Sequence, residues 1–484
     1  MKTIITAIVA GLMCGSVSLA GTINVPGDYT SIQQAMDAAN DGDTIQVAGG
    51  VYYEDGLNPG GRSISVVGDT NGDGTPAVTI DAQQNGVVFI FQSGEGPATT
   101  IENLIIRGGQ SSSGGGGIDC YKNSSPTIRN CVITDNETEY NGGGIWCWSG
   151  CEPVITGCTI SGNTSDESGG GIYCYLSSPT IIDCTISQNN ADWHGGGIHV
   201  SGGAITLSGT EVSGNITWNP IAEGCGLWCD DSTVSLESCV ITGNEGNDDG
   251  GGMFMRACTF SIDHCEVSQN SCGWGGGLFV TQSTGTVFGT AIVGNGVWNQ
   301  GGALYCGSGS TVELNGCLIS GNCGDGGSVS QTIGTTSIGA SIVCGNCAAE
   351  DCVVPSGGSG QFVDLGGNHF VVDCPVMGAC CIGDSCLANR IEMDCLAYGG
   401  TWLGENSDCG QCPEPEAAGA CCVNGLCAPL TAEDCFNVEG LFAGQGVSCE
   451  DAGCPSACPG DVSGDGQVGI VDLLTIIDGW GVCP

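Results

Sequence analysis

The sequence has very few basic residues. Seven Lys and Arg stand against 52 Asp and Glu, which gives a formal net charge of −45 over 484 residues. A field of this sign repels phosphate backbones and anionic lipid headgroups, so we expect neither nucleic acid nor an acidic membrane as a partner. It also disfavours acidic polysaccharides unless Ca²⁺ bridges the two surfaces. Charged residues are nevertheless only 12% of the chain, which indicates a folded protein rather than an acidic disordered one.

The chain also lacks a long hydrophobic run after its first residues. Residues 1–20 contain Lys2, an apolar run and the small residues Ser18 and Ala20, which is the pattern of a secretory signal peptide. No later segment reaches the roughly 18 apolar residues of a membrane-spanning helix. We therefore expect a secreted, extracellular or cell-surface protein with no membrane span. Loss of Cys14 with the signal would leave an even number of the 35 cysteines, and an oxidising compartment favours disulfides.

Glycine is abundant, and much of it belongs to an internal repeat. Gly-Gly-Gly followed by an aliphatic residue recurs roughly every 26 residues from Gly115 onwards, with three short β-prone runs and no room for a helix in each repeat. Each repeat closes on an asparagine that follows an aliphatic residue by three positions; these are Asn136, Asn163, Asn189, Asn215, Asn244, Asn270, Asn295, Asn322 and Asn346. The pattern predicts the coils of a right-handed parallel β-helix, in which the Asn side chains stack along the axis.

The expected fold class is all-β, with about 12 coils over residues 21–375. Residues 31–40 have a Ser cap and apolar residues at helical spacing, which predicts a short amphipathic helix that caps the first coil. Two six-cysteine modules follow at residues 376–416 and 417–456. Each is too small to bury a core, so we expect both to be disulfide-rich. Residues 457–484 form a last, short module with a Ca²⁺ loop and a helix.

The capping helix followed by coils resembles the start of pectin-lyase-like β-helices. The pair of motifs Gly-Gly-Gly-Ile and Ile-x-x-Asn is also similar to the repeat of polymorphic outer-membrane adhesins, which have Phe where this chain has Ile or Val. The resemblance covers residues 23–375 and implies the fold. It leaves the activity open, because lyases, hydrolases and adhesins share that fold. Pectin-lyase-like enzymes hold polysaccharide along one parallel-sheet face of this kind.

Cysteines occupy two inward columns of the predicted coils. Five coils have a cysteine in both columns and three have one in neither, which favours disulfides within one coil: Cys120–Cys131, Cys147–Cys158, Cys174–Cys184, Cys229–Cys239 and Cys306–Cys317. The alternative pairing runs along the axis, for example from Cys120 to Cys147, because adjacent coils also lie within disulfide reach.

Aromatic residues occupy the outward positions of the strand that follows the glycines. The candidate ligand-binding residues are Trp146, Tyr173, His199, Trp228, Phe254, Phe279 and Tyr305, with Trp148, Tyr175 and Asp230 two residues further along their strands. Flat rings at strand spacing suit the apolar faces of sugar rings, and an exposed apolar stripe usually marks a binding surface. The alternative is a stack of rings that only stabilises the outside of the sheet beneath the turns.

A catalytic set is not recognisable in the sequence. A pectate lyase needs a basic residue and Ca²⁺, and Arg256 is the one arginine on the outward columns. The carboxylate pairs Asp230–Asp231 and Asp248–Asp249 could hydrolyse a glycoside, but a chain with 52 acidic residues has such pairs by chance. We therefore assign no catalytic residue and favour a protein without catalysis, with a polysaccharide lyase or glycosidase as the open alternative.

Residues 461–472 fit an EF-hand-type Ca²⁺ loop. Oxygen ligands fall at the expected positions, which are Asp461, Ser463, Asp465, the backbone carbonyl of Gln467, and Asp472. Asp at the last position, followed by pairs of Leu and Ile, resembles a dockerin repeat, although dockerins carry two such repeats and this chain has one. The resemblance implies a cohesin-like or surface-anchoring partner. Dockerins commonly accompany polysaccharide-degrading enzymes.

Together these features predict a secreted or cell-surface β-helix that binds a polysaccharide or cell-surface glycan without catalysis, as an adhesin does. Its C-terminal module would attach it in a Ca²⁺-dependent manner. The alternative is a polysaccharide lyase or glycoside hydrolase of the pectin-lyase-like fold. A third hypothesis is a spacer with no defined ligand.

Overall fold

The computed structural model describes residues 20–322 without a gap. Beyond them it describes residues 328–331, 334–344, 346, 353–355, 361–371, 378–382, 385–390, 401–403, 419–423, 426–430 and 441–445. The signal sequence before residue 20 and the predicted Ca²⁺ loop at 457–484 lie outside these residues. The chain divides into two units, Met1–Cys374 and Pro375–Pro484, which are described separately.

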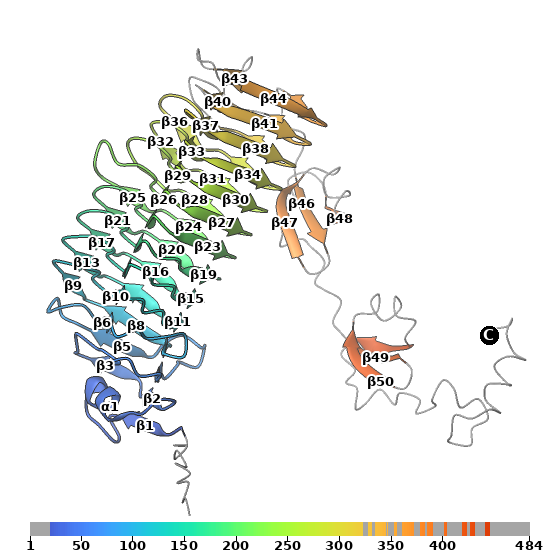
Figure 1. Ribbon diagram of the computed structural model, residues 1–484. Coiled ribbons are helices and arrows are strands. Elements are labelled where there is room, and N and C mark those ends of the chain that lie inside the picture. The colour runs from blue at the N-terminus through green and yellow to red at the C-terminus, as the bar shows by residue number, and fades with distance from the viewer. Residues whose placement is uncertain are drawn as a thin grey trace, which may run out of the picture. The chain divides into compact units, whose positions relative to one another are not determined.

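The first unit is a right-handed parallel β-helix of about 12 coils, which confirms the predicted fold class (Figure 1). Its coils form three long parallel sheets. Sheet 1 has 11 strands: β6 (Phe89–Phe91), β10 (Ile118–Tyr121), β14 (Ile145–Trp148), β18 (Ile172–Tyr175), β22 (Ile198–Ser201), β26 (Leu227–Asp230), β29 (Met253–Arg256), β33 (Leu278–Thr281), β37 (Leu304–Cys306), β40 (Val329–Gln331) and β43 (Val353–Pro355).

Within a coil the chain passes from sheet 1 to sheet 2 and then to sheet 3. Sheet 2 has 14 strands: β1 (Thr22–Val25), β2 (Thr44–Val47), β4 (Ser65–Gly68), β7 (Thr100–Glu102), β11 (Thr127–Arg129), β15 (Val154–Thr156), β19 (Thr180–Ile182), β23 (Ala204–Ser208), β27 (Thr233–Glu237), β30 (Thr259–Asp263), β34 (Thr284–Phe288), β38 (Thr311–Asn315), β41 (Thr335–Gly339) and β44 (Gln361–Gly366). Sheet 3 has 13: β3 (Gly50–Tyr52), β5 (Val78–Asp81), β8 (Leu104–Arg107), β12 (Val132–Thr134), β16 (Thr159–Ser161), β20 (Thr185–Ser187), β24 (Glu211–Ser213), β28 (Val240–Thr242), β31 (Glu266–Ser268), β35 (Ala291–Val293), β39 (Leu318–Ser320), β42 (Ile342–Cys344) and β45 (His369–Val371).

Short strands and a loop then lead back to sheet 1. Five of these strands pair in one small sheet and two in another: β9 (Gln110–Ser111), β13 (Glu137–Thr138), β17 (Thr164–Ser165), β21 (Asn190–Ala191) and β25 (Ile216–Thr217), then β32 (Ser271–Cys272) and β36 (Gly296–Val297). The glycines of the repeat lie where this segment meets sheet 1. A Cβ atom on Gly143 would lie 2.5 Å from the Thr164 carbonyl oxygen, so only glycine fits there. The glycine motif is therefore a packing requirement of the coil.

Single residues in the left-handed conformation bend the chain between sheets. Asn130 (φ 51°) turns it from sheet 2 into sheet 3, and Asp135 (φ 54°) turns it out of sheet 3. Asn, Asp and Gly tolerate this region of backbone space better than other residues, which explains their recurrence at the bends.

The predicted asparagine ladder is present in full. Asn136 Nδ2 donates to Asn163 Oδ1 at 3.0 Å, and the same bond links each successive pair up to Asn322 and Asn346. Each amide from Asn136 to Asn322 also donates to a backbone carbonyl of the preceding coil, as Asn215 does to Ile186 at 2.9 Å. Every one of these side chains is buried. The ladder satisfies the polar groups where the coils bend, and its role is structural.

The N-terminal cap also matches the prediction. Helix α1 (Ile32–Ala38) buries Ile32, Ala35 and Met36, and Ser31 accepts a hydrogen bond from Gln34 N–H at 3.4 Å. The Glu54 carboxylate accepts a second, from Ile32 N–H at 2.8 Å. An acidic side chain is favourable at this end of a helix. The helix therefore covers the open end of the apolar core.

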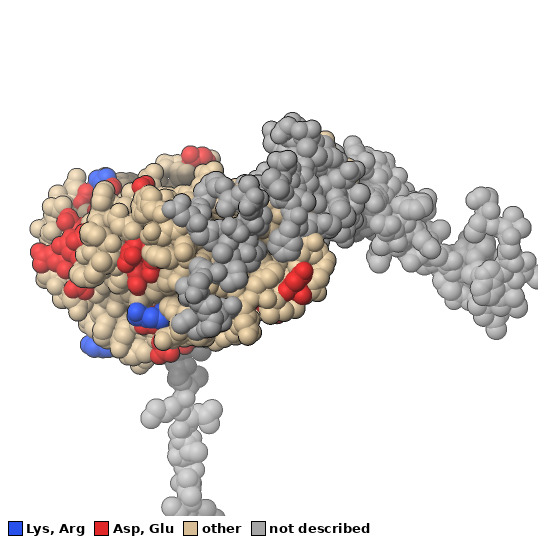
Figure 2. Space-filling view, turned by 90° about the horizontal axis from the view of Figure 1, so that it is seen from above, with Lys and Arg blue, Asp and Glu red and all other residues tan. Residues whose placement is uncertain are grey.

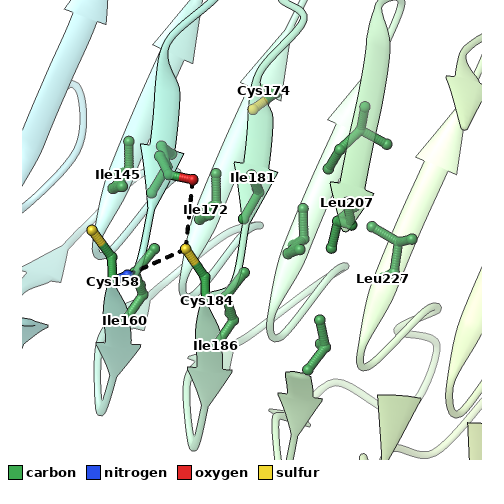
Figure 3. Close-up of a cluster of buried hydrophobic side chains, with 14 of the residues drawn as sticks. Ile145, Cys158, Ile160, Ile172, Cys174, Ile181, Cys184, Ile186, Leu207 and Leu227 are labelled. Atoms are coloured by element: carbon green, nitrogen blue, oxygen red, sulfur yellow. Dashed lines mark hydrogen bonds between the residues drawn. The ribbon is translucent and has the colours of Figure 1, made fainter. Parts of the chain in front are cut away.

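The cysteine columns differ from the prediction. At least one member of every predicted same-coil pair is a free thiol; these are Cys120, Cys131, Cys147, Cys158, Cys174, Cys184, Cys229, Cys239 and Cys306. Figure 3 shows the reason in one region, where Cys174 points inward from sheet 1 while Cys184 lies at the bend before sheet 3. Apolar residues such as Ile172 and Ile186 fill the coil. None of these same-coil bonds is formed in the structure, and the thiols in contact belong to neighbouring coils. The same-coil pairing stays a prediction.

The second unit contains two small antiparallel sheets, one in each predicted six-cysteine module. The first has the order β47 (Ser385–Arg390), β46 (Gly378–Ile382), β48 (Thr401–Trp402), and the second has β50 (Leu426–Leu430), β49 (Gly419–Val423), β51 (Leu441–Gln445). The same strand order in both agrees with the near-identical cysteine spacing of the two segments.

Candidate functional site

The outward positions of sheet 1 form two columns of side chains along the axis. In-register parallel pairing places equivalent residues of successive strands side by side. The inner column contains Trp146, Tyr173, His199, Trp228, Phe254, Phe279 and Tyr305, and the outer column contains Tyr121, Trp148, Tyr175, Ser201, Asp230 and Arg256. The predicted juxtaposition of these residues is confirmed.

Rings of the inner column stack on one another. The ring centroids of His199 lie 4.7 Å from Tyr173 and 4.2 Å from Trp228, and those of Phe254 and Phe279 lie 5.1 Å apart. These distances are typical of stabilising aromatic pairs.

The middle of the inner column is buried, which differs from the exposed stripe that the sequence predicts. Tyr173, His199, Trp228 and Phe254 are between 2% and 9% exposed, while Phe279 and Tyr305 are half-buried. The loops that enter sheet 1 cover these rings. His194, from one of them, stacks on Trp228 with a centroid distance of 5.2 Å. The four buried rings therefore stabilise the outside of the sheet, which was the alternative hypothesis.

A group of more accessible rings lies on β10, β14 and β18. Trp148 is 36% exposed and stacks on Tyr175 at a centroid distance of 4.4 Å. Trp146 lies 5.4 Å from Trp148 and 6.2 Å from Tyr121. We call Tyr121, Trp146, Trp148 and Tyr175 the aromatic platform. Tyr121, Trp146 and Tyr175 are half-buried, and Trp148 is the exposed member of the four.

Asp119 lies next to the platform in the inner-column register. Its carboxylate accepts a hydrogen bond from Gly115 N–H at 2.5 Å, and the side chain is buried. Burial raises the pKa of Asp119 to about 7, although the Gly115 bond acts in the opposite direction. This group therefore holds a proton over part of the physiological range.

Asp230, a predicted ligand residue, is engaged by Arg256 of the next coil. The guanidinium Nε and Nη2 atoms each donate to the carboxylate at 2.9 Å, and the same guanidinium lies 5.4 Å from the Trp228 ring. A bidentate pair of this kind fixes both side chains. Neither charge is therefore fully available to a ligand.

Three successive loops bring a second polar group together beside Trp228. The Glu223 carboxylate accepts a hydrogen bond from Trp228 Nε1 at 3.0 Å, and the Glu223 backbone N–H donates to His194 Nδ1 at 3.0 Å. The backbone N–H of Gly224 donates to the Asp249 carbonyl at 2.8 Å, which aligns the next loop. We call His194, Glu223, Asp248 and Asp249 the loop cluster.

The loop cluster favours uncharged side chains. Burial, and then the charges of Asp248 and Glu223, raise the pKa of Asp249 to about 7. Burial likewise raises the pKa of Glu223. Burial, and then the charge of Arg256, lower the pKa of His194 to about 4, so its imidazole is neutral at pH 7. One Asp249 oxygen is buried without a hydrogen-bond partner. A protonated carboxyl group beside another carboxylate can act in acid–base chemistry.

The sequence did not single out Glu223 or His194. Both depend on loops. Residues 218–226, between β25 and β26, belong to the coil in which the repeat departs from its usual spacing, because Asn215 and Asn244 are 29 positions apart. That departure is the one signal that marks the cluster. Asp248 and Asp249 were noted, but only as a pair expected by chance.

The described part of the chain contains no group of three or more His, Cys, Asp or Glu residues that could hold a metal ion. Among those same residues no helix has the length and apolar character needed to cross a membrane. The predicted Ca²⁺ ligands Asp461, Ser463, Asp465, Gln467 and Asp472 lie outside the described residues.

The chain is similar to other β-helical proteins. The family model for the right-handed beta helix region matches residues 76–241 and 166–297. The search of curated proteins found no match.

Three solved structures illustrate the similarity. A mannuronic acid specific polysaccharide family 6 lyase from human gut microbiota shares 10% identity at a TM-score of 0.30, covering 73% of this chain and 87% of that chain. Pectate lyase Pel9A shares 13% identity at a TM-score of 0.32, covering 62% of this chain and 76% of that chain. The catalytic unit of the GH87 alpha-1,3-glucanase from Streptomyces thermodiastaticus strain HF3-3 shares 12% identity at a TM-score of 0.30. The match covers 76% of this chain and 72% of that chain. All three are named as enzymes that act on polysaccharides. A functional assignment for this chain has to rest on sheet 1 itself.

Proposed function

We propose that the outward face of sheet 1 binds a neutral polysaccharide, with the aromatic platform as its main contact. The observation that carries the proposal is the stack of the exposed Trp148 ring on the half-buried Tyr175 ring of the next coil, whereas Tyr173, His199, Trp228 and Phe254 of the inner column are covered. Flat rings on an otherwise polar exterior suit the apolar faces of sugar rings.

The distribution of charge favours a neutral ligand over an acidic one. The net charge is −45, and carboxylates are spread over the face seen in Figure 2. Of the five described cations before residue 260, Arg107, Arg129 and Arg256 are each paired with a carboxylate. Lys122 lies at the platform, 5.0 Å from the Tyr121 ring centroid. A single lysine provides little attraction for the carboxylates of a polyuronate, which the acidic surface repels. The uncharged hydroxyl groups of a neutral polymer are not repelled.

The test is a binding panel with the full chain. Soluble glucan, mannan and xylan would be compared with pectate and alginate by affinity electrophoresis, with Ca²⁺ and with a chelator. We expect retardation by at least one neutral polymer, independent of Ca²⁺, and none by the uronates in chelator. Retardation by uronates alone, or by no polymer, would refute the proposal.

A second candidate function is glycoside hydrolysis at the loop cluster. The observation that favours it is the pair of raised carboxyl pKa values at Glu223 and Asp249, which lie on neighbouring loops beside Trp228. In this proposal Asp249 is the proton donor to the leaving sugar oxygen and Glu223 is the base or nucleophile. The proposal replaces the favoured prediction of a protein without catalysis, and it extends the alternative of a polysaccharide lyase or hydrolase.

Hydrolysis is tested by the release of reducing ends from the polymer that binds. We expect Glu223→Gln and Asp249→Asn each to lower the rate at least 100-fold, since acid–base groups contribute about that much. Asp166→Asn, an exposed carboxylate on another loop, is the matched control and should keep the full rate. The rate should fall as the pH rises above about 7, because Asp249 then loses its proton. Equal rates in all variants would exclude the loop cluster.

We also propose that residues 461–472 bind Ca²⁺ and that the C-terminal module attaches a secreted protein to a cohesin-like or other surface partner. The ligand pattern of the loop supports the proposal. Calorimetric titration should show one Ca²⁺ site in the full chain that Asp461→Ala removes. Unchanged heat in the variant would contradict the assignment.

A further inference from the structure

Cysteines of neighbouring coils form ladders along the axis of the β-helix. Cys120, Cys147 and Cys174 are register partners on β10, β14 and β18. A second ladder lies at the bend between sheets 2 and 3, where Cys131 N–H donates to Cys158 Sγ at 3.4 Å. Cys158 N–H donates in turn to Cys184 Sγ at 3.3 Å, the bond drawn in Figure 3.

A third ladder has only two members. Cys239 N–H donates to Cys265 Sγ at 3.4 Å. The register partners of Cys306, in contrast, are Val280 and Gln331, so no cysteine lies beside it on sheet 1. All the thiols of the three ladders are buried.

The thiols in each ladder are in direct contact. The side chains of Cys120 and Cys174 each hydrogen-bond that of Cys147, and those of Cys239 and Cys265 bond each other. In-register Cα atoms on adjacent strands lie about 4.8 Å apart, inside the range of about 4.4–6.8 Å found for disulfides. The hydrogen bonds between these thiols run along the axis. A further buried free thiol, Cys151, lies in the coil of Cys147 and interacts with it electrostatically.

We propose that these ladders are sites of disulfide formation between neighbouring coils. The pair Cys239–Cys265 forms one bond, and each three-membered ladder forms one bond that includes its central residue, Cys147 or Cys158. Cys344 is disulfide-bonded, which shows that the oxidised state is compatible with this fold.

A ladder of three cysteines cannot be fully paired within itself. With one bond inside the ladder, one end residue keeps its thiol and remains in contact with the bond formed by the other two, and a bond from Cys151 to a ladder thiol is a further outcome that the map distinguishes. Thiol–disulfide exchange through that contact can move the bond by one coil, so two isomers are expected in each three-membered ladder. The pair Cys239–Cys265 has no competing third member in its ladder and should form a single species.

Each bond requires two electrons and two protons to leave the chain. The acceptor would be a disulfide-carrying oxidant, whose own disulfide is reduced to two thiols as the protein bond forms. Because the mature thiols are buried, we expect the reaction to take place before neighbouring coils close on one another.

The test is a disulfide map of the full chain after refolding with reduced and oxidised glutathione. Free thiols would be alkylated in denaturant, and the unreduced digest analysed by mass spectrometry. We expect a cross-linked peptide joining Cys239 to Cys265, peptides joining Cys147 to either Cys120 or Cys174, and an alkylated Cys306. A peptide joining Cys229 to Cys239 or Cys306 to Cys317, or complete alkylation of Cys239 and Cys265, would overturn the proposal.

Two variants test the axial pairing further. Cys120→Ser should collapse the two isomers of its ladder into the single bond Cys147–Cys174. Cys306→Ser is the matched control, because it removes a buried thiol without a cysteine partner on sheet 1 and should leave every cross-link unchanged. A Cys120→Ser digest that still lacks the Cys147–Cys174 peptide would contradict the axial pairing.

Discussion

The asparagine ladder and the outward face of sheet 1 are both columns of residues stacked at strand spacing, yet they differ in uniformity. The ladder repeats the same residue from Asn136 to Asn346, and its amides bond the next coil in the same way each time. The outward face of sheet 1 changes its residue at almost every coil, from Asp119 to Trp146 to Tyr173. Only part of that face is buried.

The difference shows that one repeat meets two different requirements, closing a bend and presenting an outward face. A column that closes a bend has to satisfy the same backbone groups in every coil, so its residue cannot vary. A column that faces outward has no such requirement, and changes of residue from coil to coil give it locally distinct surfaces. At Trp148 and Tyr175 the change exposes rings, and beside Trp228 it collects carboxyl groups. Variation within the repeat therefore marks the candidate site.

The largest effect is expected when the asparagine ladder is interrupted. Asn215→Ala removes the side-chain bonds to Ile186 O and Asn244 Oδ1, both at 2.9 Å, and the bond that Asn189 Nδ2 donates at 3.0 Å. It leaves several buried polar groups unpaired, at about 1–3 kcal/mol each, so we expect a loss of about 5 kcal/mol in the free energy of unfolding.

Urea unfolding followed by circular dichroism measures that loss. A Ser213→Ala variant on the neighbouring strand is the control, because its half-buried side chain belongs to no ladder. A change below about 1 kcal/mol for Asn215→Ala would show that water replaces the amide and that the ladder does not hold the coils.

A second prediction concerns the buried carboxyl group next to the platform. The folded pKa of Asp119 is raised to about 7, whereas an unfolded Asp titrates near pH 4. Between these values the folded chain keeps a proton that the unfolded chain has lost, so the free energy of unfolding falls as the pH rises. The full loss, reached above pH 7, is about 4 kcal/mol.

Asp119→Asn removes the titration and keeps an oxygen for the Gly115 bond. The variant should therefore be more stable than the wild type at pH 8 and similar to it at pH 4. Unfolding in urea at both pH values, with the exposed Asp166→Asn as control, measures the effect. Parallel pH profiles for wild type and Asp119→Asn would contradict the assigned pKa.

The part of this account that sequence alone could supply depends on regular spacing. The positions of Asn136 and Trp146 in their columns follow from the repeat, because each coil adds one strand in register. The burial of His199 does not follow from it, since the ring is covered by loops whose packing is a tertiary property. Glu223 was not singled out from the sequence for the same reason. Spacing also leaves the cysteine pairing open between the two alternatives, because it carries no information on the width of the coil that separates Cys174 from Cys184.

The smallest effect is expected at the bends of sheet 3, outside both columns. Arg107 and Asp81 form a salt bridge at 3.0 Å at the rim of an open depression, and the Arg107 side chain is 45% exposed. Solvent screens such pairs, so Arg107→Gln should change the free energy of unfolding by less than about 1 kcal/mol. Polysaccharide retardation should be unaffected. A larger loss of stability would show that side-chain pairs at this surface contribute to holding the coils together.

Whether the ligand lies on sheet 1 is decided by comparing Trp148→Ala with Phe288→Ala, in binding and in stability. Both rings are exposed, but Phe288 lies on sheet 2. The account predicts that Trp148→Ala weakens binding of the neutral polymer about tenfold, or about 1.4 kcal/mol, with little change in melting temperature. It predicts that Phe288→Ala binds as the wild type does. Equal binding by both variants would contradict the assignment of the ligand to the outward face of sheet 1.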